Sequence, residues 1–407
     1  MERQHTIEGK NDEKDSQPLS YVLLHHSFRF SSLDVMAQKR TNSWYDQLDK
    51  LPEVRYTLPN RQIGSTPFYF EAVSTATNFN KKDTTAPFSS VNEDVFRLDS
   101  TKKLSLPFRA AFLQVTPFVA HRLTTYDKDN RGDTLVSRTI FYTGSEVSTK
   151  FYRVFNVRSK FLGIEIDKLR HVVTPTISYA YNHEPTIPSW RLKQIDSVDS
   201  IDLSNAVAFE LSNKLQTKRN DQSVNLLDFR VRSSYVLYDV EPQTGYRRGG
   251  QLSDFLIDLE LLPFSWLSIF SDAKYNPKGK YISEANYDIN FSLGKERSFG
   301  IGQRYLKKGG NEITSSFKWR LSPKWQFSTY QRYQNGHGID IKKGLSEHEY
   351  SVWRDMHCWV MGLTYNIKKD EGHSIWIVFK LKAFPEMEFG FDQSYNEPKS
   401  GSQQPNP

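Results

Sequence analysis

The feature that most constrains this chain is an alternation of apolar and polar residues that returns along most of its length. From Leu227 to Leu237, apolar side chains occupy alternate positions over most of the segment, with charged or hydroxyl-bearing residues between them. The segments 285–293 and 313–321 repeat the pattern. Because successive side chains of a β-strand point to opposite faces, each segment is a strand with one apolar and one polar face. A barrel closed within a lipid bilayer gives the two faces the surroundings they need.

The composition favours a membrane barrel over a soluble globular domain. The chain has 407 residues, of which only 37% are hydrophobic, and its mean hydropathy is −0.62. Aromatic residues nevertheless reach 14%, which is not a disordered composition. An apolar outer band combined with a polar interior explains both values. No segment approaches the roughly 18 apolar residues of a spanning helix, so a helical membrane protein is excluded.

The alternating segments predict about 18 to 20 strands between residues 21 and 384. Tight-turn sequences occur at 276–279 and 308–310, and longer polar connections at 127–134, 182–204 and 241–250. We expect the short turns at one end of a barrel and the long loops at the other. The expected organisation is a polar N-terminal segment at 1–18, an all-β transmembrane antiparallel β-barrel at 19–385 and a disordered tail at 386–407.

The charge and the chain start allow further expectations. The net charge is +7, but the basic residues are spread along the chain, so a nucleic-acid partner is not expected. A solvated barrel interior and attraction of anionic ligands both remain open as explanations. The first 18 residues, MERQHTIEGKNDEKDSQP, contain no apolar core and are not a signal peptide. We therefore expect the chain to be the C-terminal part of a longer product, within a larger barrel.

Four groups of motifs follow one another in the first half of the chain. They are Leu51-Pro52-Glu53-Val54 with Phe68-Tyr69-Phe70, Arg97-Leu98-Asp99 with Val115-Thr116-Pro117-Phe118, Thr149-Lys150-Phe151 with Arg153-Val154-Phe155, and Leu169-Arg170-His171-Val172-Val173-Thr174-Pro175. In this order and spacing they resemble the C-terminal domain of LptD, also called OstA, the outer-membrane lipopolysaccharide assembly protein. The similarity extends from about residue 51 to residue 384.

The resemblance implies a barrel in the Gram-negative outer membrane that inserts lipopolysaccharide into the outer leaflet. It also implies contact with outer-membrane lipids, an LptE-like plug lipoprotein and an LptA-like periplasmic bridge. In the family the bridge is reached through an N-terminal β-jellyroll, which we do not expect within these 407 residues. The family's first and last strands form a lateral gate, but no gate residue can be assigned here. The family also places a disulfide-forming cysteine pair near Cys358, so Cys358 is either an interdomain or intermolecular disulfide partner or a lone thiol.

Candidate functional residues are cations on the polar faces of the strands. Arginine binds phosphate with a planar fork of donors, and lipopolysaccharide carries phosphates and acidic sugars. The candidates for a lumen-facing substrate path are Arg230, Arg232, Lys318, Arg320 and Arg332. Ordinary lining of a polar interior, with ion pairs, is the alternative for each of them.

Enzymatic motifs are missing from the sequence, which has no phosphate-binding Gly loop, HExxH, CxxC or Gly-x-Ser-x-Gly elbow. We therefore expect no enzyme, cofactor or metal. The alternatives left open are an outer-membrane barrel enzyme acting on lipids or peptides, a generic outer-membrane channel or receptor, and a soluble β-rich binding protein.

Prolines and aromatic residues mark special positions in the strands. Pro107, Pro117 and Pro175 remove ladder donors, and predict either strand starts and bulges or a locally weakened sheet. A set of aromatic residues near expected strand ends predicts an interfacial girdle. Its members are Trp319, Trp325, Tyr330, Trp353, Trp359, Tyr365 and Trp376.

Overall fold

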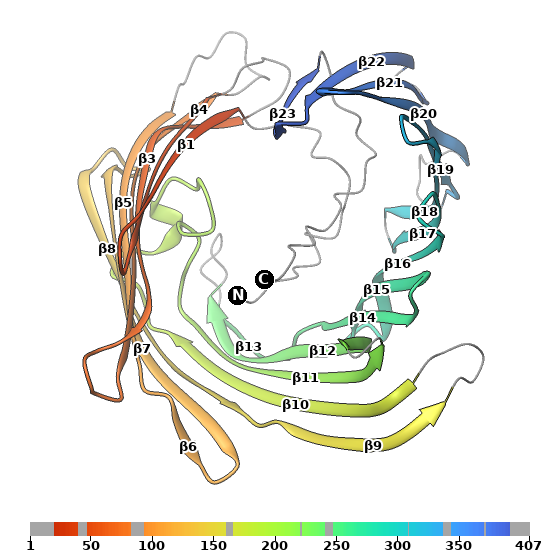
Figure 1. Ribbon diagram of the computed structural model, residues 1–407. Helices are drawn as coiled ribbons and strands as arrows, with labels where there is room; N and C mark the ends of the chain where they lie inside the picture. The colour runs from red at the N-terminus through yellow and green to blue at the C-terminus, as the bar shows by residue number, and fades with distance from the viewer. Residues whose placement is uncertain are drawn as a thin grey trace.

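The chain folds into a single antiparallel sheet arranged as a ring. The computed structural model describes residues 20–39, 47–82, 93–159, 166–219, 222–240, 247–307, 309–336, 343–369 and 372–390. Within these ranges 23 β-strands belong to one sheet, and the view in Figure 1 shows them around a common centre. The prediction of an all-β antiparallel barrel-like fold is confirmed. The expected N-terminal segment 1–18 lies outside the described residues, as do positions 391–407 of the expected tail.

The strands of the first half occupy one side of the ring in Figure 1 and pair in chain order, except that β5 pairs with β7 and β8 with β10. Their bounds are β1 Tyr21–Ser27, β2 Ser32–Gln38, β3 Gln47–Gln62, β4 Tyr69–Lys82, β5 Glu93–Ser105, β6 Phe108–Ala110, β7 Leu113–Lys128, β8 Thr134–Ser148, β9 Phe151–Ser159, β10 Ile166–Asn182 and β11 Ser204–Arg219. One turn of 3-10 helix, η3 at Ser189–Arg191, lies in the connection between β10 and β11.

The second half completes the ring. Its strands are β12 Gln222–Val240, β13 Arg247–Leu252, β14 Phe255–Phe264, β15 Leu267–Asn276, β16 Tyr281–Leu293, β17 Arg297–Leu306, β18 Gly310–Ser322, β19 Trp325–Gln334, β20 Gly344–Met356, β21 Trp359–Lys368, β22 Gly372–Leu381 and β23 Phe384–Gly390. β23 continues past residue 385, where the barrel was expected to end. Among the described residues, no helix is long and apolar enough to cross a membrane.

Four strands, β6, β9, β13 and β23, account for the difference between the 23 observed strands and the smaller expected number. The alternation predicts one strand over 137–155, where the structure has β8 and β9, and these two strands keep one register along β10. Ser148 pairs with Thr176 and Phe151 pairs with Val173, so two residues between the strands are left out of the ladder. This break lies opposite Pro175, which has no N–H to donate.

Proline also explains the break between β5 and β6. Pro107 lies in the break itself, and the carbonyl of Pro117 accepts a hydrogen bond from the backbone N–H of Leu106 at 3.0 Å. Ser105 pairs with Phe118 and Phe108 with Val115, so here too the register continues across the gap. Pro107 thus lies between two strands, whereas Pro117 and Pro175 lie within β7 and β10, opposite the breaks in the neighbouring strands. At all three positions the register continues past the proline.

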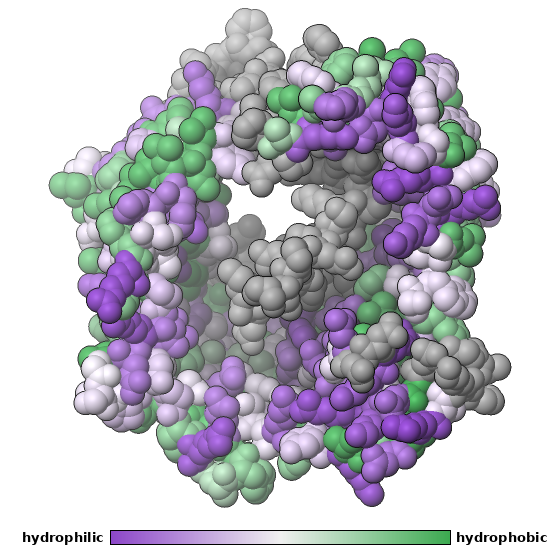
Figure 2. Space-filling model, in the orientation of Figure 1, coloured by the Kyte–Doolittle hydropathy of each residue, from purple (hydrophilic) through white to green (hydrophobic). Residues whose placement is uncertain are grey.

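The two faces of the sheet differ as the alternation requires. One face carries large apolar side chains that remain exposed, including Leu211 at 42%, Leu363 at 46% and Ile377 at 41%. The opposite face carries polar side chains that are buried against one another, such as Asp272 and Asn366. Figure 2 shows green apolar patches on the rim of the ring between hydrophilic residues. Repeated exposed apolar rows of this kind indicate an outer face that contacts lipid.

The expected separation of short turns from long loops is wrong for the connections chosen from the sequence. Strand directions place 276–279 and 308–310 at the same end as 127–134, 182–204 and 241–250. The opposite end has its own tight turns, at 265–266, 294–296, 323–324, 357–358 and 382–383. Local turn chemistry predicts how tight a connection is, but its end of the barrel depends on how many strands precede it. We call the end with the connections 127–134, 182–204 and 241–250 the loop end, and the opposite end the turn end.

The aromatic residues expected in a girdle divide between the two faces. Trp319, Trp325, Trp359 and Tyr365 lie on the outer face and are 36–42% exposed. The registers place Tyr330, Trp353 and Trp376 on the inner face instead. The ring of Trp353 packs over Gly362, where an added Cβ would lie 2.5 Å from it. For these three residues the expected girdle position is wrong, because proximity to a strand end does not determine which face a residue occupies.

Candidate substrate path through the barrel

The expected path residues on β12 lie on the inner face and face carboxylates of neighbouring strands. Arg230 lies 3.5 Å from Glu210, and Arg232 lies 3.8 Å from Asp258. Both arginine side chains are about one quarter exposed. The inner wall here consists of alternating charges, which can hydrate and hold polar groups without binding them tightly.

Arg332 on β19 lies in a similar setting between two acidic side chains. Its guanidinium is 3.5 Å from Glu312 and 3.7 Å from Glu347. Lys318 and Arg320 lie on the same inner face of β18, nearer the turn end. In the described part of the chain neither has a carboxylate within ion-pair distance. Arg320 is exposed, and Lys318 is half-buried, as are Arg230, Arg232 and Arg332.

The five candidates do not form one compact site. Five steps between neighbouring strands separate β12 from β18, or roughly 24 Å along the sheet. Arg332 pairs with Thr314, four residues from Lys318, which is about 13 Å along the strand. The cations therefore mark positions along the interior wall, as a path requires and a single binding pocket does not.

A larger polar assembly lies on the opposite wall and was not expected from the sequence. The connection 183–203 between β10 and β11 folds inward and packs on the inner faces of β5, β7 and β8, and its helical turn is visible inside the ring in Figure 1. We call residues 183–203 the strap. Its polar sequence predicts only a long loop.

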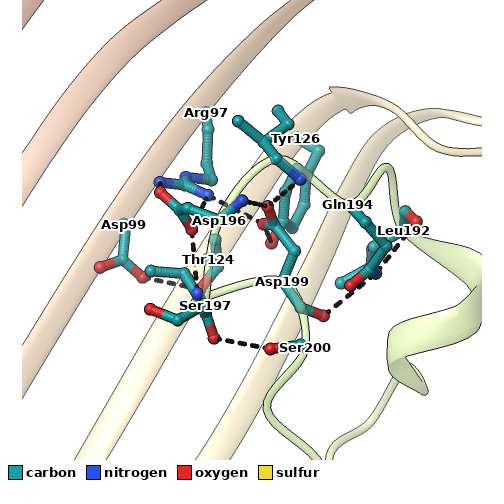
Figure 3. Close-up of polar contacts among 12 residues, drawn as sticks. Arg97, Asp99, Thr124, Tyr126, Leu192, Gln194, Asp196, Ser197, Asp199 and Ser200 are labelled. Carbon is teal, nitrogen blue, oxygen red and sulfur yellow. Dashed lines mark hydrogen bonds and ion pairs between the residues drawn. The ribbon is translucent and has the colours of Figure 1, made fainter. Parts of the chain in front are cut away.

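Asp199 is the centre of the strap's attachment (Figure 3). Its side chain is fully buried and accepts hydrogen bonds from Arg97 at 2.9 Å and from the Tyr126 hydroxyl at 2.6 Å. Its second oxygen accepts the backbone N–H groups of Ile195 and Asp196 at 2.9 and 3.0 Å. The Asp199 carboxylate thus connects β5 and β7 to the strap turn that contains Ile195 and Asp196.

Asp196 completes the ion pair from the strap side. Arg97 donates to its two oxygens at 2.9 and 2.6 Å. Burial by itself would raise the pKa of Asp196, but the hydrogen bond and the positive charge of Arg97 more than offset it, and the pKa lies below its ordinary value. Asp196 is therefore charged throughout the physiological range, and the strap carries a permanent ionic attachment.

Arg138 on β8 holds the remainder of the strap through backbone carbonyl groups. Its side chain is 1% exposed and donates to the carbonyls of Ile187 at 2.9 Å and Val198 at 3.3 Å, and to that of Ile201. It also lies 3.4 Å from Asp202. A guanidinium has five N–H donors, so a single side chain can satisfy several carbonyl groups of an irregular segment.

An apolar cluster lies beside these polar contacts. Val95, Tyr126 and Val136 on the barrel wall pack with Leu192 of the strap, and all four are at most 7% exposed. These apolar residues occupy the inner face, where the alternation alone predicts polar ones. The strap covers them, which is the physical reason why this part of the wall departs from the pattern.

Two sequence signals pointed toward the strap. Asp196, Asp199 and Asp202 recur at intervals of three in the 182–204 connection. Arg97 also belongs, together with Asp99, to one of the motifs that carry the family resemblance. Asp99 accepts two hydrogen bonds from Arg122, at 2.7 and 2.8 Å. Because about one hundred residues separate Arg97 from Asp199 in the sequence, the sequence does not indicate that they pair.

Cys358 lies in the tight connection between β20 and β21 at the turn end. Its side chain is exposed, and its sulfur lies 3.1 Å from Nδ1 of His357. As the sequence contains one cysteine, no disulfide forms within the chain. A thiol at this position is accessible to a cysteine of another chain or domain.

Comparisons with known proteins give one family and several distant structural similarities. The family model described as "LptD: LPS transport system D" matches residues 14–330. No curated protein matches the chain significantly.

The solved structures with detectable similarity have low identity. The ferric yersiniabactin uptake receptor FyuA from Yersinia pestis is 9% identical, with a TM-score of 0.35 over 92% of this chain and 72% of the receptor. The ferric enterobactin receptor PfeA from Pseudomonas aeruginosa, as a Q482A mutant, is 6% identical, with a TM-score of 0.46 over 90% and 71%. The FrpB iron transporter from Neisseria meningitidis is 10% identical, with a TM-score of 0.41 over 92% and 73%.

Proposed function

Because the chain belongs to the LptD family of lipopolysaccharide transport proteins, we propose that it forms an outer-membrane barrel whose interior carries the sugar portion of lipopolysaccharide to the outer leaflet. The family acts in transport and assembly and is not a family of enzymes. Lipopolysaccharide is its substrate, and its partners are other proteins of the lipopolysaccharide transport pathway.

The observation that carries the proposal is the contrast between the two faces of the sheet. Apolar side chains remain exposed on the outer face, and charged and amide side chains line the inner one. Lipopolysaccharide has the same division, with acyl chains at one end and a phosphorylated saccharide at the other. A barrel wall of this kind lets the acyl chains stay in lipid while the saccharide moves through a hydrated interior.

The orientation follows from the two ends of the barrel. Outer-membrane barrels have short turns toward the periplasm and longer loops outside. The turn end, with Cys358, therefore faces the periplasm, and the strap lies at the outer side. In this orientation a periplasmic domain or chain forms a disulfide with the exposed Cys358. An LptA-like bridge delivers lipopolysaccharide to the same end, and an LptE-like lipoprotein enters the interior from it.

The exit to the outer leaflet lies between the two ends of the sheet. β1 and β23 are the first and last strands, and they come to the same side of the ring in Figure 1. No ladder between them occurs among the described residues. All seven residues of β1 are exposed. Two weakly joined edges are where a barrel can open sideways with least loss of hydrogen bonds.

Site-specific crosslinking tests the proposed route. A photoreactive amino acid replaces Lys318 on the inner face or Leu363 on the outer face, and crosslinks to lipopolysaccharide are detected with an antibody against its saccharide. The proposal expects saccharide crosslinks from position 318 that disappear when supply from the periplasm is blocked. Equal crosslinking from both positions, or none from 318, would reject an interior route.

A second experiment tests the cations themselves. Neutralising Arg230, Arg232 and Arg320 together should slow lipopolysaccharide delivery, because these groups attract the phosphates along the wall. The control removes three exposed turn or loop cations, with Lys295, Lys324 and Lys343 each changed to Gln. Unchanged delivery by the arginine variant at normal protein levels would remove these residues from the path.

A further inference from the structure

A cavity at the loop end of the inner wall lies between the β12–β13 hairpin and strands β14 and β15. Its volume is about 1020 Å³, and its lining includes Arg232, Lys274 and Lys278. Figure 1 shows β13 turned toward the middle of the ring, and the lining residues Arg232 and Lys274 belong to the inner face. Of the five path residues expected from the sequence, Arg232 alone belongs to this cavity.

The cavity exists because the backbone changes course at one point. β12 pairs with β14 from Leu227 to Arg232 and with β13 from Tyr235 onward. Ser233 and Ser234 lie between these two ladders, and their hydroxyl groups bond to the carbonyl and hydroxyl of Ser253 at 3.0 and 2.9 Å. The serine contacts hold the bend in place and add hydroxyl groups to the cavity lining.

Two glycines keep the cavity open. An added Cβ at Gly249 would lie 2.3 Å from the carbonyl oxygen of Leu237, so a larger residue cannot occupy this position without moving the hairpin. Gly250 has φ +66°, which favours glycine. Both residues line the cavity, and neither has a side chain to fill it.

The charge of the lining is unusual for this wall. Arg232 lies 3.8 Å from Asp258, whereas elsewhere on the inner face Arg304 donates to both oxygens of Asp288 at 2.9 Å. The cavity contains three cationic residues and one acidic residue, Asp254. Asp254 lies 3.6 Å from Lys274 and accepts a hydrogen bond from Asn276 at 2.8 Å. When Asp258 beside Arg232 is counted with Asp254, three cations face two carboxylates, and the local field favours an anion.

We propose that this cavity is a binding subsite for a phosphorylated or carboxylated oligosaccharide. Arg232, Lys274 and Lys278 bind the anionic substituents, while Ser233, Gln251 and Asn276 bind sugar hydroxyl groups. The volume is at the upper end of small-molecule sites, enough for a few sugar units. The subsite rests on the proposed function, in which the saccharide passes along this wall, and it gives the outer part of the path a resting position.

Binding measurements on the purified full chain in detergent test the subsite. The probes are a delipidated phosphorylated core oligosaccharide, the same oligosaccharide after enzymatic removal of phosphate, and inorganic phosphate, each titrated calorimetrically. The test variant is Lys274→Gln with Lys278→Gln. The control is Lys343→Gln with Lys295→Gln, which removes equal charge from exposed positions outside the cavity lining.

The subsite predicts that the phosphorylated oligosaccharide binds the natural chain and the control at least tenfold more tightly than the cavity variant. It also predicts weaker binding of the dephosphorylated sugar and of phosphate alone. Equal binding of phosphate and oligosaccharide would show a simple anion site and overturn the saccharide assignment. Equal binding to the natural chain and the cavity variant would overturn the subsite altogether.

Failure of the subsite and failure of the proposed function give different results in cells. Surface lipopolysaccharide is measured after depletion of the chain and complementation with the cavity variant. If depletion leaves surface lipopolysaccharide unchanged, the proposed function fails. If depletion lowers it but oligosaccharide binding does not depend on Lys274 and Lys278, only the subsite fails.

Discussion

Removing the carboxylate of Asp199 should release the strap from the barrel wall. The fully buried side chain accepts hydrogen bonds from Arg97, Tyr126 and two backbone N–H groups. In Asp199→Ala the Arg97 side chain, 7% exposed, loses Asp199 and keeps Asp196 as an ion-pair partner. Breaking a buried ion pair from one side costs about 3–5 kcal/mol. Each 1.4 kcal/mol changes an equilibrium constant tenfold. The equilibrium constant for strap opening should therefore increase by about two to more than three powers of ten.

Hydrogen–deuterium exchange measured by mass spectrometry reports this opening directly. Peptides covering 186–203 should exchange faster by that factor, while peptides from β14–β19 should keep their protection. Tyr126→Phe removes one of the four donors and should give an intermediate increase, because a hydrogen bond to a charged group contributes about 1.5–3 kcal/mol. This variant also keeps the test valid if the alanine variant fails to form a barrel.

The matched control is Asp133→Ala. Asp133 also pairs with a strap residue, Arg191, at 2.9 Å, but its side chain is 63% exposed. An exposed ion pair contributes at most about 1 kcal/mol, so exchange should rise tenfold at most. Strap exchange within threefold of the natural chain in both Asp199→Ala and Tyr126→Phe, with the barrel intact by its heat-modifiable band, would refute the attachment.

Three further outcomes follow from the structure. In Gly302→Val the Cβ would lie 2.4 Å from Asp288 Oδ1, so the free energy of unfolding of the barrel should fall by about 1–3 kcal/mol. The heat-modifiable band should then convert at a lower temperature, and an unchanged conversion temperature would contradict the close approach. Because the folded-state pKa of Asp196 is lowered, its contribution is present above its ordinary value near 4 and is lost as the pH falls through the folded pKa. Strap exchange, corrected for its intrinsic rate, should therefore be constant from pH 8 to 5 and rise only below about 4; a rise near pH 6.5 would assign the attachment to another group. Cys358 should react fully with a maleimide in detergent, and a larger species on non-reducing gels of cells, abolished by Cys358→Ser, would show the disulfide; its absence would leave a lone thiol.

The strands were predictable because alternation is a local property. The alternation predicts strands at 21–27, 281–293 and 325–334, and β1, β16 and β19 have these bounds. The breaks at Pro107 and Pro175 were visible as prolines, but whether a proline ends a strand or only interrupts its ladder depends on the register of its neighbour. The sequence pattern therefore gives the sheet and most of its strands, but not how it divides into segments.

Alternation also predicts which face a residue occupies, and Arg230, Arg232, Lys318, Arg320 and Arg332 all lie on the polar face, while their role in a substrate path stays a prediction. The distances between these cations depend on the order and tilt of the strands, and the sequence of a single strand does not determine either. The strap was missed for the same reason. Arg97 and Asp199 each look like ordinary polar residues until the chain brings them together, and Leu192 resembles a loop residue until the wall beneath it is known.

Depletion of this chain in its own host, followed by labelling of lipopolysaccharide at the cell surface, tests the central claim most directly. A translocon barrel predicts that surface lipopolysaccharide falls while the pool held on the periplasmic side rises. Re-expression of the chain, together with whatever partner domains the host supplies, should restore the surface signal. Unchanged surface lipopolysaccharide after depletion would contradict the account and show that this barrel does not deliver the lipid.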